Sequence, residues 1–267
     1  MVYFYGILPI MGRQKISKIN SLLQAWPKNT VAVYLWLDKK GISRKLAEQY
    51  QKSGWVKSIG RGAVIRAGDE ISWEGGLYAI QTQLGQHIHV GGNTALELHG
   101  YAHQVPARQT VKLFAAAEEK LPAWFRKHSW RQDIAILATN LFSTSENLGI
   151  TKKQYADFAI KISSPERAIM ELLYQVPENY PYGEAKLLME GLATLRPDLV
   201  QKLLEHCSSI KVKRLFMILA EDFDFSWLKK LKSAHVDFGS GKRSLIKGGK
   251  LHPKYLITVP IETENSH

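Results

Sequence analysis

The strongest constraint on the fold is a pair of short helical patterns separated by a turn of a few residues at Gly41. The first pattern places Val33, Trp36 and Leu37 on one face and cannot continue through the glycine. The second begins after Ser43, a residue type whose hydroxyl commonly caps the free N–H groups at a helix start. Two short helices across so tight a turn predict a helix-turn-helix.

The sequence on the N-terminal side extends this pattern. Ile16, Ile19 and Leu23 recur at helical spacing and predict an earlier helix that ends before Pro27. Thr30 is expected to cap the helix that follows. The segment is therefore predicted to contain three helices.

A strand pattern follows the third helix. Gly54 suits the left-handed position at a helix end, and residues 55–59 and 63–66 are β-type runs on either side of Gly60-Arg61-Gly62. Two short strands around a glycine-flanked tip predict a wing, so the whole segment is expected to be a winged helix-turn-helix.

Charge separates this segment from the rest of the chain. The 267 residues carry a formal net charge of +12, and residues 1–69 hold 12 basic against three acidic side chains. The other 198 residues hold 24 basic and 21 acidic side chains. A surplus concentrated in this way indicates a polyanionic partner, such as nucleic acid, for the N-terminal segment.

The third helix and the wing supply most of the candidate DNA contacts. With Leu46 and Tyr50 turned inward, the opposite face of the helix is polar and largely basic. Arginine and glutamine read base edges in the major groove, whereas lysine and a basic hairpin tip suit phosphates. The predicted DNA-binding residues are Arg13, Lys15, Lys18, Ser43, Arg44, Lys45, Glu48, Gln51, Lys52, Lys57, Arg61 and Arg66. The alternative is an ordinary solvated helix face.

The remaining sequence predicts a larger domain that contains both helices and strands. Helices are expected over residues 73–84, 94–98, 184–192, 198–207 and 212–220, and strands over residues 87–90, 111–114, 134–138 and 158–162. We therefore predict an α+β chain. A winged helix-turn-helix domain is expected over residues 1–70, with residues 1–14 as a poorly ordered extension, and a mixed α/β domain over residues 71–267.

A further helix is expected after Ser164, where a proline at the first helical position precedes an apolar stripe. Glu166 and Arg167 lie in its first turn, and a structural role is expected for both because no partner group indicates catalysis. Gly91-Gly92 matches neither glycine-rich phosphate motif, so a tight chain reversal is the preferred interpretation over a phosphate cradle. No catalytic residues and no cofactor are predicted.

Four histidines raise the hypothesis of a metal site. The spacings of His87, His89, His99 and His103 allow them to converge on one ion. No HExxH motif accompanies them, so packed or hydrogen-bonded histidines are the preferred interpretation and no metal is predicted.

The cysteine count and the N-terminus indicate a cytoplasmic protein. Cys207 is the only cysteine and can form no disulfide within the chain, which fits a reducing compartment. The apolar residues 1–11 are too few to span a bilayer and lack the basic residues of an export signal. Met11 is an alternative start.

A basic stretch near the C-terminus, residues 229–254, holds eight basic side chains against Asp237 alone. Its two interpretations are a solvated loop and a second contact surface for an anionic partner.

Two parts of the chain carry a family resemblance. The first includes Gly41-Ile-Ser43, Ser53-Gly-Trp55, His89-Val-Gly-Gly92 and Gly100-Tyr-Ala-His103, and the second is Ser163-Ser-Pro-Glu-Arg-Ala168. Together they resemble the AbiEi family of antitoxins from type IV toxin–antitoxin systems, from Lys15 to about Leu173.

This resemblance implies a winged-helix repressor that binds inverted repeats in its own operon. It also implies that the larger domain neutralises a nucleotidyltransferase-like toxin without a stable complex, and it designates no active site. Double-stranded operator DNA and the toxin are thus the expected partners, and no membrane is expected. The alternative is a solitary winged-helix regulator or RNA-binding protein without a toxin, which a neighbouring nucleotidyltransferase gene would distinguish.

Overall fold

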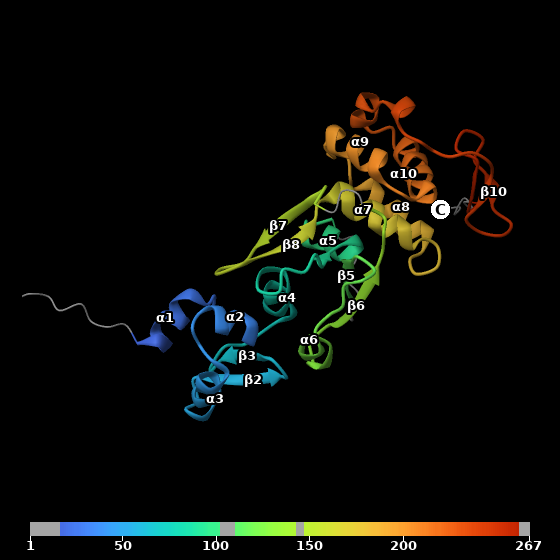
Figure 1. Ribbon diagram of the computed structural model, residues 1–267. Coiled ribbons are helices and arrows are strands. Elements are labelled where there is room, and N and C mark those ends of the chain that lie inside the picture. The colour runs from blue at the N-terminus through green and yellow to red at the C-terminus, as the bar shows by residue number, and fades with distance from the viewer. Residues whose placement is uncertain (1–16, 102–109, 143–146, 262–267) are drawn as a thin grey trace, which may run out of the picture.

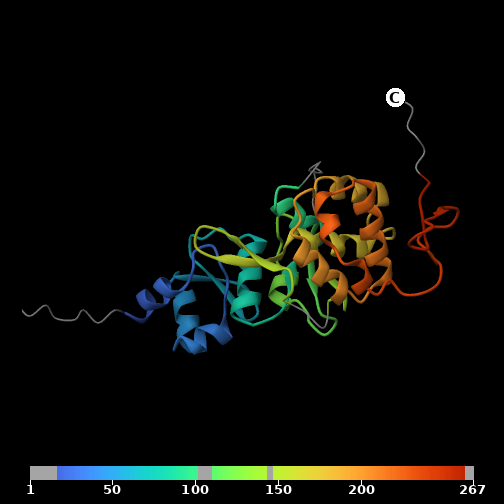
Figure 2. The ribbon, with the colours of Figure 1, turned by 90° about the horizontal axis from the view of Figure 1, so that it is seen from above.

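The computed structural model describes residues 17–101, 110–142 and 147–261 (Figures 1 and 2). Its helices are α1 (Lys18–Ala25), α2 (Tyr34–Lys39), α3 (Arg44–Lys52), α4 (Trp73–Thr82), α5 (Gly92–Leu98), α6 (Ala123–Lys127), α7 (Pro165–Gln175), α8 (Tyr182–Glu190), α9 (Pro197–His206) and α10 (Ile210–Asp222), with 3-10 turns η1 (Ser226–Lys230) and η2 (Ser233–His235). Its strands are β1 (Ala32–Val33), β2 (Val56–Gly60), β3 (Ala63–Arg66), β4 (His89–Val90), β5 (Thr110–Ala115), β6 (Asp133–Ala138), β7 (Ile150–Gln154), β8 (Ala159–Ser163), β9 (Arg243–Ser244), β10 (Lys250–Leu251) and β11 (Ile257–Val259). The chain is α+β, as the sequence predicts.

The N-terminal part has the predicted winged helix-turn-helix architecture. Strands β2 and β3 pair antiparallel around the tip at Arg61, and β1 pairs with the other edge of β3. Helices α1 to α3 pack with one face of this small sheet in a shared core. The buried residues between them are Leu22, Trp26, Ala32, Leu37, Ile42, Ala47, Val56 and Val64.

The predicted start of the second helix is wrong. The helix begins at Tyr34 rather than after Thr30, because Ala32 and Val33 form β1 and pair with β3. The Thr30 hydroxyl instead donates a hydrogen bond to the carbonyl of Pro27. The long-range pairing with β3 therefore overrides the local capping signal.

The second part is built on a five-stranded mixed sheet in the order β6-β5-β4-β8-β7. Strand β5 runs parallel to β6 and β4 runs parallel to β8, whereas the β4–β5 and β7–β8 pairs are antiparallel. The predicted strands correspond to β4, β5, β6 and β8. Strand β7 was not predicted, because its sequence Ile-Thr-Lys-Lys-Gln contains no apolar run.

The β1-β3-β2 sheet packs against both parts of the molecule. Its second face buries Val31, Val33, Ala63 and Ile65 in the same core as α4 and the five-stranded sheet. The Gln83 amide, just beyond α4, donates to the Val31 carbonyl and accepts from the Val33 N–H. The division of the chain at residue 70 stays a prediction, and these contacts hold the two parts together.

Candidate nucleic-acid interface

Helix α3 carries five of the twelve residues predicted to meet DNA, and a sixth, Ser43, precedes it. The Ser43 hydroxyl accepts a hydrogen bond from the Leu46 N–H and so caps the helix start, as predicted. Ala47 is the fully buried residue of the helix, with Leu46 and Tyr50 half-buried beside it. The exposed side chains are those of Arg44, Lys45, Glu48, Gln49 and Lys52. The helix therefore exposes three cations, one carboxylate and one neutral amide to solvent.

The Arg44 guanidinium forms an ion pair with Glu48 one turn later, with 3.3 Å between Arg44 Nε and Glu48 Oε1. The Arg44 side chain is 77% exposed, so water screens the pair and its strength is about 0.3–0.5 kcal/mol. Such a weak pair orients the guanidinium without preventing its transfer to a guanine edge or a phosphate.

The wing adds two exposed cations, Lys57 on β2 and Arg61 at the tip. Gly62 turns the tip with a φ of 91°, a left-handed conformation that favours glycine. Gly60 lies so close to Trp124 of α6 that an added Cβ would be 3.0 Å from the tryptophan Cβ. The second part of the molecule therefore contacts the hairpin at Gly60, next to its tip.

Two predicted contact residues are engaged inside the protein instead. The Gln51 amide donates to the Tyr34 hydroxyl at 2.9 Å. Arg66 donates to the Leu23 carbonyl and stacks over the Trp26 ring, and burial lowers the pKa of its guanidinium. In this arrangement Arg66 fastens the wing to α1.

The remaining predicted contacts lie outside this face. Lys18 is exposed on α1, and Ser43 serves as the cap. Arg13 and Lys15 lie outside the described residues.

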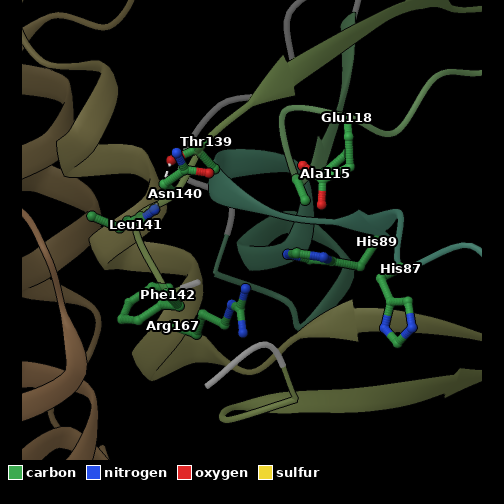
Figure 3. Close-up of a pocket in the computed structure, with 10 residues that line it drawn as sticks. His87, His89, Ala115, Glu118, Thr139, Asn140, Leu141, Phe142 and Arg167 are labelled. Carbon is green, nitrogen blue, oxygen red and sulfur yellow. Dashed lines mark hydrogen bonds between the residues drawn. The ribbon is translucent and has the colours of Figure 1, made fainter. Parts of the chain in front are cut away.

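A separate pocket of about 210 Å³ opens in the second part, at the carboxyl ends of β5 and β6 (Figure 3). Its polar lining comes from His87, His89, Glu118, Thr139, Asn140 and Arg167, and the Arg167 guanidinium lies over the Phe142 ring. Figure 3 shows His89 and Arg167 turned toward the space between the strand ends and α7. Behind them lies the buried carboxylate of Glu171, which is not among the residues predicted from the sequence.

The Glu171 side chain of α7 is 1% exposed and accepts hydrogen bonds from residues on four elements, α7 itself included. Its Oε1 lies 2.8 Å from both His89 Nε2 and Arg167 Nε, and its Oε2 accepts from the Ser163 hydroxyl and the Gly92 N–H. Burial alone raises the pKa of this carboxyl group, but His89 and Arg167 outweigh that effect and hold it at about 2. The carboxylate therefore joins β4, α5, β8 and α7.

The glycine pair is explained by this carboxylate. A Cβ on Gly91 would overlap the carboxylate of Glu171 and the ring of Phe114. Gly92 adopts a φ of 56° and turns its N–H toward Glu171. The Glu171 carboxylate thus occupies the position that a phosphate would take beside these glycines. The backbone at Gly91 lies so close to Glu171 and Phe114 that no side chain fits there.

The four histidines do not form a metal centre in the described part of the chain. His89 is bonded to the buried carboxylate, the His99 ring N–H donates to the Ser163 carbonyl, and His87 lies at the exposed rim of the pocket. His103 lies outside the described residues. Among the residues described, no group of three or more histidine, cysteine, aspartate or glutamate side chains is placed to hold a metal ion.

Glu166 has a partner beyond the helix dipole. Its carboxylate accepts from the Arg196 backbone N–H at 3.0 Å and from the Arg196 side chain at 2.9 and 3.0 Å. Burial raises the pKa of this carboxyl group, but the hydrogen bonds from Arg196 outweigh it and hold the pKa at about 2. Thirty residues separate the partners, so the first-turn position alone could not identify the pair.

Comparison with known proteins places the chain in a family. A model of the N-terminal domain of AbiEi antitoxin transcriptional regulators matches residues 15–107, and a model of AbiEi antitoxin transcriptional regulators of type IV toxin–antitoxin systems matches residues 108–260. The chain belongs to the AbiEi family. Both descriptions name transcriptional regulators and antitoxins, and neither names an enzyme activity. The two matches confirm the resemblance seen in the sequence.

The fold has a counterpart among solved structures. The crystal structure of the RV2827C protein from Mycobacterium tuberculosis matches with a TM-score of 0.51 and 12% sequence identity, covering 90% of this chain and 88% of that chain. At this identity the likeness concerns the fold alone. None of the curated proteins compared matches the chain. Of the helices in the described residues, none combines the length and the apolar composition that crossing a membrane requires.

Proposed function

We propose that this AbiEi family member represses its own operon by binding double-stranded operator DNA through α3 and the β2–β3 wing. The observation that carries the proposal is the exposed face of Arg44, Lys45 and Lys52 on a capped helix, with Arg61 at the tip of the adjacent hairpin. In winged-helix proteins the N-terminal turns of such a helix enter the major groove. We infer that the operator contains inverted repeats, one for each bound copy.

Arg44 and Arg61 are expected to differ in what they contribute. Arg44→Ala should weaken binding to operator DNA by about 1–3 kcal/mol and to scrambled DNA much less, because a guanidinium in the groove bonds guanine in bidentate fashion. Arg61→Ala should weaken both and lower the salt slope by about one, because the tip meets phosphate. Titration of both duplexes at several salt concentrations measures these effects.

Lys202→Ala is the control for this titration, since Lys202 is exposed on α9 within the second part. It should leave both affinities unchanged. Equal losses on the two duplexes for Arg44→Ala would remove its role in sequence recognition, and salt-independent binding by the parent protein would contradict the electrostatic argument.

We further propose that the part of the chain beyond the winged helix neutralises a nucleotidyltransferase-like toxin encoded beside it, without a stable complex. Co-expression of both genes from separate inducible promoters is expected to restore growth. The double variant Arg44→Ala/Arg61→Ala should rescue as well as the parent, because neutralisation is assigned to the second part. Loss of rescue by this folded variant would show that the DNA-binding face participates. Absence of rescue by the parent would favour the solitary regulator or RNA-binding protein.

A further inference from the structure

The basic C-terminal stretch folds into a small sheet at the end of the molecule opposite the winged helix (Figures 1 and 2). Its strand order is β10-β11-β9, with β10–β11 antiparallel and β11–β9 parallel. We call this sheet with its loops, residues 239–259, the basic arm. Neither the family assignment nor the proposed DNA contacts of the winged helix give the basic arm a role.

The basic arm is fastened to the helical body by Arg214 of α10. This guanidinium is 2% exposed and donates to the carbonyls of Phe238, Gly241 and Leu256 at 2.9 to 3.0 Å. Tyr255 of the arm is 5% exposed, and its hydroxyl donates a hydrogen bond to Glu221 of α10. A buried arginine that satisfies backbone carbonyls fixes the loops of the arm in one arrangement.

The outer surface of the arm displays a set of exposed cations. They are Lys242, Arg243, Lys247 and Lys250. Within the described residues no salt bridge involves any of the four, whereas Lys254 pairs with Glu221. Residues 238–267 contain five basic side chains against Glu262 and Glu264, which lie outside the described residues. Four exposed like charges on one short arm create a positive potential that attracts a polyanionic partner.

The chemistry of this surface favours a nucleic-acid backbone over a protein or a membrane. Lysine is depleted at the centres of protein interfaces, whereas nucleic-acid interfaces are strongly positive. A membrane-surface element needs a broad apolar face, but the large aromatic residue of the arm is buried against the body. A projecting β-ribbon is moreover a shape that reaches the grooves and phosphates of nucleic acids.

We propose that the basic arm binds the phosphodiester backbone of a nucleic-acid segment, separately from the winged helix. Lys242, Lys247 and Lys250 supply point charges to successive phosphates. The partner is recognised by its backbone charge rather than by its base sequence, and both duplex DNA and RNA present that chemistry.

The test uses the full-length chain in which the winged helix is disabled by Arg44→Ala/Lys45→Ala/Arg61→Ala. Fluorescence anisotropy against a 24-base-pair scrambled duplex and a 24-nucleotide single-stranded RNA, at several salt concentrations, measures the remaining binding. Adding Lys242→Ala/Lys247→Ala/Lys250→Ala should weaken that binding at least tenfold at low salt. The salt slope should fall by roughly two to three, because about 0.9 of slope per contact is lost on duplex and about 0.7 on a single strand.

A matched triple variant, Lys229→Ala/Lys230→Ala/Lys232→Ala, removes the same charge from η1 and the loop after it. It should change the slope by less than one. Binding of a probe that is weakened only by the arm variant supports the proposal, and the probe affected shows whether the partner is duplex DNA or single-stranded RNA. Binding of neither probe, or equal losses in both triple variants, overturns it. If the Arg44→Ala/Lys45→Ala/Arg61→Ala variant binds operator DNA as tightly as the parent, the winged-helix proposal fails instead. The comparison of the two lysine triple variants still tests the arm in that case.

Discussion

Replacing Glu171 by alanine is expected to lower the free energy of unfolding by about 3–5 kcal/mol, because it leaves the buried Arg167 without its carboxylate partner. The same change removes the acceptor for the Ser163 hydroxyl and the Gly92 N–H. Chemical denaturation at pH 7 measures the effect. Glu190→Ala, at an exposed position on α8, is the matched control and should lie within about 0.5 kcal/mol of the parent.

The pH dependence gives this prediction a second readout. The pKa of Glu171 is held at about 2 in the folded protein, below the value of about 4.3 for an unfolded glutamate. A depressed carboxyl pKa stabilises the folded state above the unfolded pKa, and that stabilisation is lost as the pH falls toward the folded pKa. The difference between parent and Glu171→Ala should therefore be full at pH 7 and shrink between pH 5 and pH 2. A difference below 1 kcal/mol at pH 7, or one that does not change with pH, would contradict the assigned network.

The winged helix was largely predictable because its signals are local. Ser43 caps α3 and the wing glycines turn the tip where the sequence places them. The errors arise where partners are distant in sequence. Thr30 carries a valid capping signal, yet pairing with β3 decides the structure of the residues after it.

The candidate DNA face shows the same limit in its side chains. Helical periodicity correctly predicts that Arg44 and Lys45 are exposed. It cannot reveal that Gln51 meets the Tyr34 hydroxyl or that Arg66 reaches α1, because both contacts depend on how separate elements pack. Helix spacing thus predicts which face is outward, but only the packed structure shows which side chains remain available.

The buried carboxylate network could not be assembled from the sequence, since its members are up to 82 residues apart. One signal was nevertheless present. Arg167 and Glu171 stand four residues apart within a helix whose neighbouring positions, Ala168 and Leu172, are apolar and buried. Two charged residues at this spacing within a buried stretch indicate an internal ion pair, which sequence alone cannot connect to His89.

Helix α7 is the central packing element of the second part, in contact with α5, α8, α9 and α10 (Figure 1). Leu172 is fully buried within it, whereas Leu187 of α8 is 54% exposed. Leu172→Ala is expected to lower the free energy of unfolding by about 2–5 kcal/mol, because it removes a buried side chain and leaves a cavity. Leu187→Ala deletes the same atoms and should cost about 0.5 kcal/mol or less.

Urea denaturation of both variants separates burial from the chemistry of the deletion. Because the helices of the winged helix have their own small core, around Leu37 and Val64, the folded Leu172→Ala protein should still bind operator DNA with the affinity of the parent. Equal costs for the two deletions would contradict the placement of Leu172. Loss of operator affinity by Leu172→Ala, at a urea concentration where the protein remains folded, would show that the shared core through Val33 and Ala63 transmits changes in the second part to the DNA-binding face.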